Sequence, residues 1–149
     1  MKIAIASDHG GVVLKGKILE YLEKKNLEFE DMGTYDCTAV DYPEFGEKVA
    51  LAVKEGKFDK GICICGTGIG IGIAANKVPG IRAALCHDTF SARNSREHND
   101  ANVLCMGERV IEAGLAADIV DIWLHTEFAG GRHAKRVEKI TQIERKYSK

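Results

Sequence analysis

The sequence predicts an α/β fold: a three-layer αβα arrangement with a Rossmann-like, doubly wound, parallel sheet of five strands. Short runs rich in Ile, Val, Ala, Leu and Cys alternate with amphipathic, charge-rich stretches, which is the pattern of strand-helix-strand units. Most of these apolar runs are continuous, as expected for strands buried on both faces. The expected strands are residues 2–6, 28–31, 60–65, 81–85 and 103–106.

Helices are expected between these strands and after the last one. The first, residues 11–25, has Ile18 and Leu22 on one side, and its lysines, among them Lys15 and Lys17, are expected on the other faces. The second begins at Pro43, because the fixed φ of proline suits a first helical turn, and ends at Gly56. The others are a helix that starts in the glycine-rich segment after residue 65, and helices over residues 89–97, 111–125 and 131–147.

Length and composition indicate one globular domain, residues 1–149. The chain has 149 residues, a net charge of -1, 45% hydrophobic and 29% charged residues, which gives no general reason to bind nucleic acid or a membrane surface. No apolar stretch approaches the roughly 20 residues of a membrane span, and residues 3–6 are too short for a signal-peptide core. Five cysteines, an odd number, favour free thiols in a reducing compartment. We therefore expect a cytoplasmic protein whose partners are a small molecule and further copies of itself.

A glycine-rich segment follows the third strand, and we call residues 65–72 the glycine loop. Ligands of open parallel sheets bind outside the carboxyl ends of the strands. Alternate glycines expose successive backbone N–H groups there, at the start of the next helix. The loop therefore predicts an anion site for a phosphate, a cofactor pyrophosphate or the oxyanion of an intermediate, and close helix-strand packing without a ligand is the alternative.

Two cysteines of the third strand differ in what their positions predict. Cys63 and Cys65 can share one face of the strand, but the sequence lacks the paired Cys-x-x-Cys clusters of zinc sites, so no metal site is expected. Cys63 is expected in the core. Cys65 lies at the strand end, beside backbone donors and a helix N-terminus, which favours a thiolate that acts as base or nucleophile; an inert buried thiol is the alternative.

For the polar residues elsewhere in the chain, the sequence allows two alternative interpretations each. Asp8 and His9 follow the first strand and form either a site pair or a cap on the next helix. His98 precedes the fifth strand and is either a general acid/base or a surface histidine. Arg132 and Arg136 are four residues apart on a helix and share a face, which suits either a phosphate dianion or a solvated basic surface.

Taken together, these segments resemble a known family. They are Ser7-Asp8-His9-Gly10-Gly11, Asp41-Tyr42-Pro43, Cys65-Gly66-Thr67-Gly68-Ile69-Gly70 with Ala74-Ala75-Asn76-Lys77, Glu97-His98-Asn99-Asp100 and Gly130-Gly131-Arg132-His133. Over essentially the whole chain they resemble ribose-5-phosphate isomerase type B, of the sugar-phosphate isomerases that include the allose-6-phosphate and galactose-6-phosphate enzymes. The resemblance implies an aldose-ketose isomerase of the non-oxidative pentose phosphate pathway, without metal or cofactor. It would interconvert ribose 5-phosphate and ribulose 5-phosphate through an enediolate, and allose 6-phosphate is a further substrate the resemblance allows.

The resemblance also implies residue roles. Cys65 would move the proton between C1 and C2, and His98 with Asp8 would assist opening of the furanose ring. Thr67 and the loop backbone would stabilise the oxyanion, and Asn99 would hydrogen-bond the sugar. The loop residues are Gly66, Gly68, Ile69, Gly70, Ile71 and Gly72, and the phosphate ligands are His9, Arg109, Arg132 and Arg136. Sites would lie at the interface of a homodimer, with some ligands from the partner and the last helix packed at the interface, and dimers can pair into tetramers.

Two positions compare this chain with different members of the family it resembles. A second form of the family uses a glutamate where this chain has Ile71, so this is the cysteine form, and Val12 replaces an aromatic residue of many relatives, which leaves substrate range open. Two rival functions remain. A nucleotide-dependent enzyme would use the glycines of the loop, with Asp88 as ribose-binding acid. A non-catalytic sensor of phosphate ligands would need no reactive thiol at Cys65.

Overall fold

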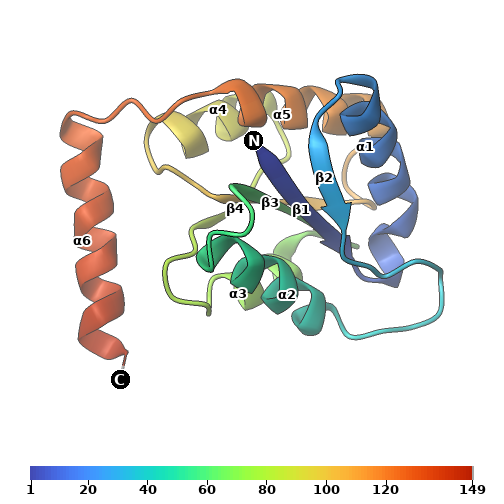
Figure 1. The fold of residues 1–149 in the computed structure, drawn as a ribbon, viewed down its shortest axis with the longest axis horizontal. Helices are drawn as coiled ribbons and strands as arrows, with labels where there is room; N and C mark the ends of the chain where they lie inside the picture. Colours follow the sequence, from blue (N-terminus) through green and yellow to red (C-terminus); the bar gives the residue numbers. More distant parts are fainter. Residues whose placement is uncertain (149) are drawn as a thin grey trace.

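The computed structural model describes residues 1–148 and shows a parallel sheet between two helical layers (Figure 1). The strands are β1 (Lys2–Ser7), β2 (Glu28–Asp31), β3 (Lys60–Cys65), β4 (Ala83–Leu85) and β5 (Val103–Gly107). The helices are the 3-10 turn η1 (His9–Gly11), α1 (Val12–Lys24), α2 (Tyr42–Lys54), α3 (Ile69–Ala75), α4 (Thr89–Glu97), α5 (Ala113–His125) and α6 (Arg132–Tyr147). The predicted fold class and its five strands are confirmed.

The strand order, β2-β1-β3-β5-β4, determines where a ligand can bind. From β1 the chain passes through α1 to β2 on one side, and from β3 it passes through α3 to β4 on the other side. The carboxyl ends of β1 and β3 are therefore neighbours at the point where the connections diverge, and open α/β sheets form their ligand crevice there. Because Ser7 pairs with Ile64, Asp8 and Cys65 follow at the same level of the sheet.

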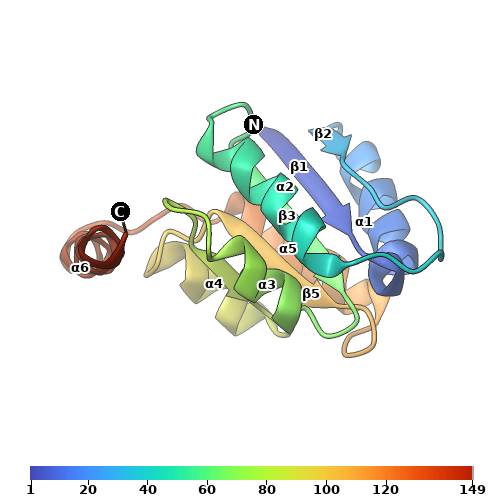
Figure 2. The same cartoon turned by 90° about the horizontal axis from the view of Figure 1, so that it is seen from below.

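Helices cover both faces of the sheet, with α2 and α3 on one face and α1, α4 and α5 on the other (Figure 2). Side chains of β3 alternate between the two cores: Ile62 and Ile64 join the larger core, whereas Cys63 and Cys65 join the core beneath α2 and α3. The expectation that the two cysteines share a face is confirmed. No helix among residues 1–148 is long and apolar enough to cross a bilayer.

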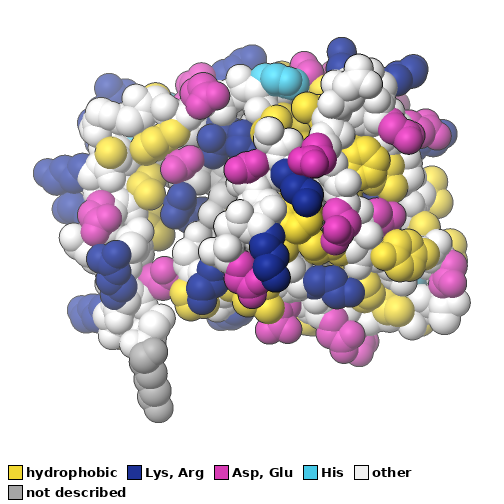
Figure 3. Space-filling model, in the orientation of Figure 1, with side chains coloured by type: hydrophobic (Ala, Val, Ile, Leu, Met, Phe, Trp, Pro, Cys, Tyr) yellow, Lys and Arg dark blue, Asp and Glu magenta, His cyan; other side chains and the backbone are white. Residues whose placement is uncertain are grey.

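Helix α6 belongs to neither layer and extends away from the body at the left of Figure 1. None of its residues is buried, and Ile140, Ile143 and Tyr147 expose apolar side chains. One link to the body is Gly80, whose N–H donates to the carboxylate of Glu144 at 3.0 Å. Lys and Arg side chains extend from much of its length in the space-filling view (Figure 3). A long helix with an exposed apolar side in a single chain favours association with another molecule.

The expected outward position of Lys15 is wrong. Its side chain is 3% exposed, its Nζ lies 2.7 Å from Asp31 Oδ1 at the end of β2, and it also donates to the carbonyl of Thr34. The ammonium thus ties α1 to the segment that leads into the β2-α2 loop. A buried cation is tolerated because its partners satisfy its charge and its donors.

Lys15→Ala is expected to lower the free energy of unfolding by about 3 kcal/mol, because it leaves the partly buried Asp31 carboxylate without its partner. Urea denaturation of the variant and the wild type measures the difference. The matched control is Lys17→Ala, since Lys17 is exposed on the same helix and should change stability by no more than about 0.5 kcal/mol. Equal effects of the two changes would show that the buried ion pair contributes nothing specific.

Candidate active site

A cavity of about 450 Å³ opens at the carboxyl ends of β1 and β3. It brings together residues that are far apart in the sequence: Asp8 after β1, Cys65 at the end of β3, and Arg109 after β5. Thr67 and Gly70 of the glycine loop complete this side, and Tyr42, Ile69 and Ile73 line the remainder. The predicted base, Cys65, and one predicted phosphate ligand, Arg109, thus share this cavity with part of the predicted oxyanion site, namely Gly66, Thr67, Ile69 and Gly70.

Cys65 differs from the other thiols in its surroundings. Its Sγ accepts a hydrogen bond from the N–H of Gly68 at 3.1 Å, and a thiolate accepts such a bond more strongly than a thiol does. Burial raises the pKa of Cys86 to about 11, and the pKa of Cys105 lies well above its ordinary value because of its hydrogen bond with Cys63 and its burial. These core thiols therefore stay protonated and inert, whereas Cys65 borders the cavity.

The glycine loop turns sharply from β3 into α3. Gly68 has φ +77°, and a side chain there would lie 2.7 Å from the backbone of Met106, so the position requires glycine. The N–H of Ile69 donates to Thr67 Oγ1 at 3.2 Å, and the N–H of Gly72 is used within α3. Within residues 1–148, the N–H groups of Gly70 and Ile71 donate to no protein acceptor, so both are available to an anion. The side chain of Ile71 is fully buried in the core.

Hydrogen bonds to backbone groups hold the other predicted site residues near the carboxyl ends of the strands. Asp8 is 7% exposed, and its Oδ1 accepts the N–H of Gly10 at 2.9 Å, so it caps η1 while it lines the cavity. Arg109 donates its backbone N–H to the carbonyl of Gly66 at 3.0 Å, and its guanidinium lies over the Cα of that glycine. His9 accepts the N–H of Val40 at Nδ1 (3.1 Å), which leaves Nε2 to carry the proton and donate.

The remaining predicted site residues lie at the opposite edge of the sheet, where the strands have their amino ends. His98 follows α4, and the nearby Asn102 carbonyl accepts the N–H of Gly61 at the amino end of β3 (2.9 Å). At about 3.3 Å per residue, Cys65 lies about 13 Å farther along that strand. The carbonyl of Glu97 accepts the N–H of Ala129 at 3.0 Å, which holds the segment leading to Arg132 at this edge too. A single chain therefore separates two groups that the sequence assigns to one site: His98, Asn99, Arg132 and Arg136 at this edge, and Asp8, His9, Cys65, Thr67 and Arg109 at the carboxyl edge.

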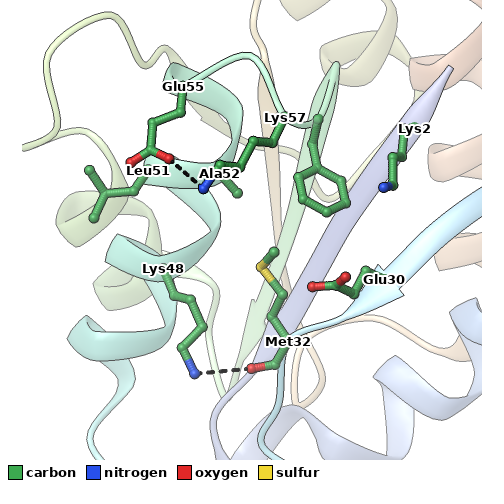
Figure 4. A pocket seen from close by; sticks show the side chains of 9 residues that line it. Lys2, Glu30, Met32, Lys48, Leu51, Ala52, Glu55 and Lys57 are labelled. Atoms are coloured by element: carbon green, nitrogen blue, oxygen red, sulfur yellow. Dashed lines mark hydrogen bonds and ion pairs between the residues drawn. The ribbon is translucent and has the colours of Figure 1, made fainter.

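A larger cavity, of about 610 Å³, lies between β2, the start of β1 and the second half of α2 (Figure 4). Its cations already have partners: Lys57 pairs with Glu55 at 3.0 Å, Lys48 donates to the carbonyl of Met32, and Lys2 lies over the ring of Phe58. None of the sequence-predicted site residues lines it. Volume alone therefore does not identify the active site, because this cavity brings no base together with oxyanion donors.

The structure places Asp88, the acid that a nucleotide-dependent enzyme would use to bind ribose, at the N-cap of α4. Its carboxylate caps α4 by accepting the N–H of Ser91 at 2.6 Å, and this bond lowers the pKa of Asp88. The acid is thus committed to the helix N-terminus. The position of Asp88 gives the nucleotide alternative no support.

Comparison with known proteins agrees with this geometry. The model of the ribose/galactose isomerase family matches residues 3–140. The chain belongs to this family. Ribose-5-phosphate isomerase B of Escherichia coli is 51% identical over 145 residues and covers 97% of both chains, and a putative sugar phosphate isomerase of Bacillus subtilis is 57% identical over 98% of this chain and 99% of its own. The solved structure of ribose-5-phosphate isomerase B from Clostridium thermocellum has a TM-score of 0.98 and 63% identity, and the match covers 99% of this chain and 100% of that one.

Two residues to which the family resemblance gave no role lie beside the glycine loop. The ring of Tyr42, at the start of α2, packs so closely on Gly70 that a side chain there would lie 2.5 Å from it. His87, after β4, accepts the N–H of Gly107 at Nε2 (3.0 Å), and Gly107 lies directly against the backbone of Thr67. Tyr42 could have been found from its place in the Asp41-Tyr42-Pro43 motif, but nothing local in the sequence marks the contact of His87.

The contact of His87 predicts a pH dependence of stability. Burial lowers the pKa of His87 below its ordinary value of 6.5, so folding favours the neutral ring. This stabilisation is fully present above about pH 6.5 and is lost as the pH falls through the lowered pKa of the folded protein. His87→Gln keeps an acceptor that does not titrate, so its unfolding free energy should fall less in acid than that of the wild type.

Chemical denaturation at a series of pH values measures this difference. The matched control is His125→Gln, which changes an exposed histidine at the end of α5 and should keep the acid loss of the wild type. An unchanged acid loss in His87→Gln would contradict the assignment.

Proposed function

We propose that the protein interconverts D-ribose 5-phosphate and D-ribulose 5-phosphate by proton transfer through an enediolate, with no metal and no cofactor. The observation that carries the proposal is the cavity in which Cys65 meets the free N–H groups of the glycine loop, Asp8 and Arg109. Family membership and the names of the isomerase B relatives support the choice of substrate. Allose 6-phosphate is a second substrate to be compared.

In the open-chain aldose, the Cys65 thiolate takes the proton from C2, and the electron pair of that C–H bond forms the C1–C2 double bond. Negative charge develops on the carbonyl oxygen, where the N–H groups of Gly70 and Ile71 and the hydroxyl of Thr67 can stabilise it. A proton then passes from the C2 hydroxyl to O1, and the thiol returns its proton to C1 as the carbonyl forms at C2, which completes the ketose. A base beside preorganised donors is the combination that abstraction next to a carbonyl requires.

Two of the proposed phosphate ligands, Arg132 and Arg136, lie where a dianion would be stabilised. Arg132 and Arg136 occupy the first turns of α6, a helix with no acidic residue in its first turn. Cations there oppose the helix dipole, and a bound dianion relieves this repulsion. Within residues 1–148, neither arginine forms an ion pair, so both guanidinium groups are available. Binding energy from this remote group orients the reacting carbons.

We propose further that the active enzyme is a homodimer, in which α6 and the end of α4 of one subunit complete the cavity of the other. The separation of the two groups of site residues within one chain supports this, because no single chain places them together. Exposed apolar side chains beside the cavity, those of Ile69, Ile73 and Leu85, provide a surface for the partner. In this proposal the dimers can also pair into tetramers. We further propose a cytoplasmic location, which the four buried free thiols support.

The test is to incubate the purified protein with ribose 5-phosphate and a metal chelator and to follow ketose formation. Turnover that persists in the chelator is the expected result. Absence of turnover on both ribose 5-phosphate and allose 6-phosphate would overturn the proposal. Ligand binding without turnover would instead support the phosphate-ligand sensor.

A further inference from the structure

The rings of His98 and His133 stack on each other. Their centroids are 4.2 Å apart and their planes differ by 12°. The two residues come from different elements, because His98 caps the end of α4 and His133 lies in the first turn of α6. Within residues 1–148 neither imidazole forms a side-chain hydrogen bond, so the stacked neighbour is what constrains each ring.

Backbone hydrogen bonds and a glycine turn before α6 hold these rings together. The N–H of Ala129 donates to the carbonyl of Glu97, the residue before His98, at 3.0 Å. Gly130 and Gly131 then take φ values of +66° and +53°, which turn the chain into α6. The N–H of His133 closes the turn on the carbonyl of Gly130 at 3.0 Å.

The charge state of the pair is consistent with a stable stack. Loss of solvent and the positive charges of His98, Arg132 and Arg136 lower the pKa of His133 below its ordinary value. The lowered pKa disfavours a cationic His133 ring, so the stack is not held by two cations placed face to face. A neutral flat ring can support a neighbour that gains and loses a proton.

We propose that His133 is a positioning residue that fixes the ring plane of His98 for the opening of the sugar ring; this rests on the proposed function. In that step the proton leaves the anomeric hydroxyl, its electron pair forms the C1 carbonyl, and the bond from C1 to the ring oxygen breaks as that oxygen gains a proton. His98 moves these protons. His133 acts by holding the imidazole and has no contact with the reacting atoms.

The experiment compares His133→Ala, His133→Phe, His98→Ala and the double alanine variant in ribose 5-phosphate turnover. His133→Ala should lower kcat about tenfold with little change in KM, because the reacting group loses its orientation while the phosphate ligands remain. His133→Phe should restore most of kcat, since it keeps a flat ring without a titrating group. In the His98→Ala background, His133→Ala should cause no further loss. Lys135→Ala, an exposed change on the same turn, is the control and should leave kcat unchanged.

An NMR measurement on the free protein separates this proposal from the proposed function. His133→Ala should shift the ring-proton resonances of His98 by removing the ring current of its neighbour. Unchanged resonances, additive losses in the double variant, or equal defects in His133→Phe and His133→Ala would each overturn the positioning role. If the wild type failed to convert ribose 5-phosphate, the proposed function would fall, and the resonance shift would still test the stack.

Discussion

Replacing Cys65 with alanine is expected to lower kcat for ribose 5-phosphate by about 10³-fold while KM changes little. In the proposed mechanism the thiol takes the C2 proton, whereas the proposed oxyanion donors and phosphate ligands stay in place. The side chain is only 4% exposed at the end of β3, and the change removes its sulfur together with the hydrogen bond that the sulfur accepts from the N–H of Gly68. Steady-state kinetics of ketose formation measures the effect.

Cys63→Ala is the matched control, because Cys63 lies two residues earlier on the same face of β3 and is fully buried. It should keep kcat within a factor of about two and lower the free energy of unfolding by about 1 kcal/mol. A Cys65→Ala enzyme that retained a tenth or more of wild-type kcat would assign the proton transfer to another group, and Asp8 in the same cavity would be the first to test.

The fold could be predicted where local pattern and burial agree. Strand β3 and helix α4 have the bounds expected from the sequence, residues 60–65 and 89–97, because a continuous apolar run and a polar amphipathic stretch mark them. Strand β4 begins at Ala83, two residues later than expected, because Asn102 accepts the backbone N–H of Arg82 through its side chain in place of a ladder bond. The burial of Lys15 could not be predicted, since its partners belong to β2 and the loop after it.

The candidate site divides in the same way. Asp8, Cys65 and Arg109 could be placed together from sequence, because residues that directly follow parallel strands meet at one edge. His98 could not be placed from its motif. Helix α4 returns from the carboxyl edge to the amino edge before β5 begins, so the residue at its end lies at the far side of the sheet. Which end of the strands a motif reaches depends on topology, and the separation of the motifs within one chain supports the proposed homodimer.

This geometry predicts subunit complementation. Cys65→Ala and His98→Ala, each nearly inactive alone, should regain activity when they are mixed, unfolded and refolded together at equal amounts. If each site takes Cys65 from one chain and His98 from the other, half of the dimers are hybrids, and each hybrid has one intact and one doubly defective site. Recovery to about a quarter of wild-type activity is therefore expected.

The control mixes the Cys65→Ala variant with an Asp8→Ala variant. Both residues line the same cavity of a single chain. Every site in their hybrid keeps one defect, because the Cys65 and Asp8 of a given cavity come from a single chain. This mixture should stay inactive, and size-exclusion chromatography with light scattering should show the same dimers in both mixtures. No recovery in the first pair despite formation of hybrids would mean that His98 reaches Cys65 within one chain, which would require α4 and α6 to leave the positions they hold in this fold. Recovery in the control would mean that the Asp8 and Cys65 of one site come from different chains, which contradicts the cavity they share.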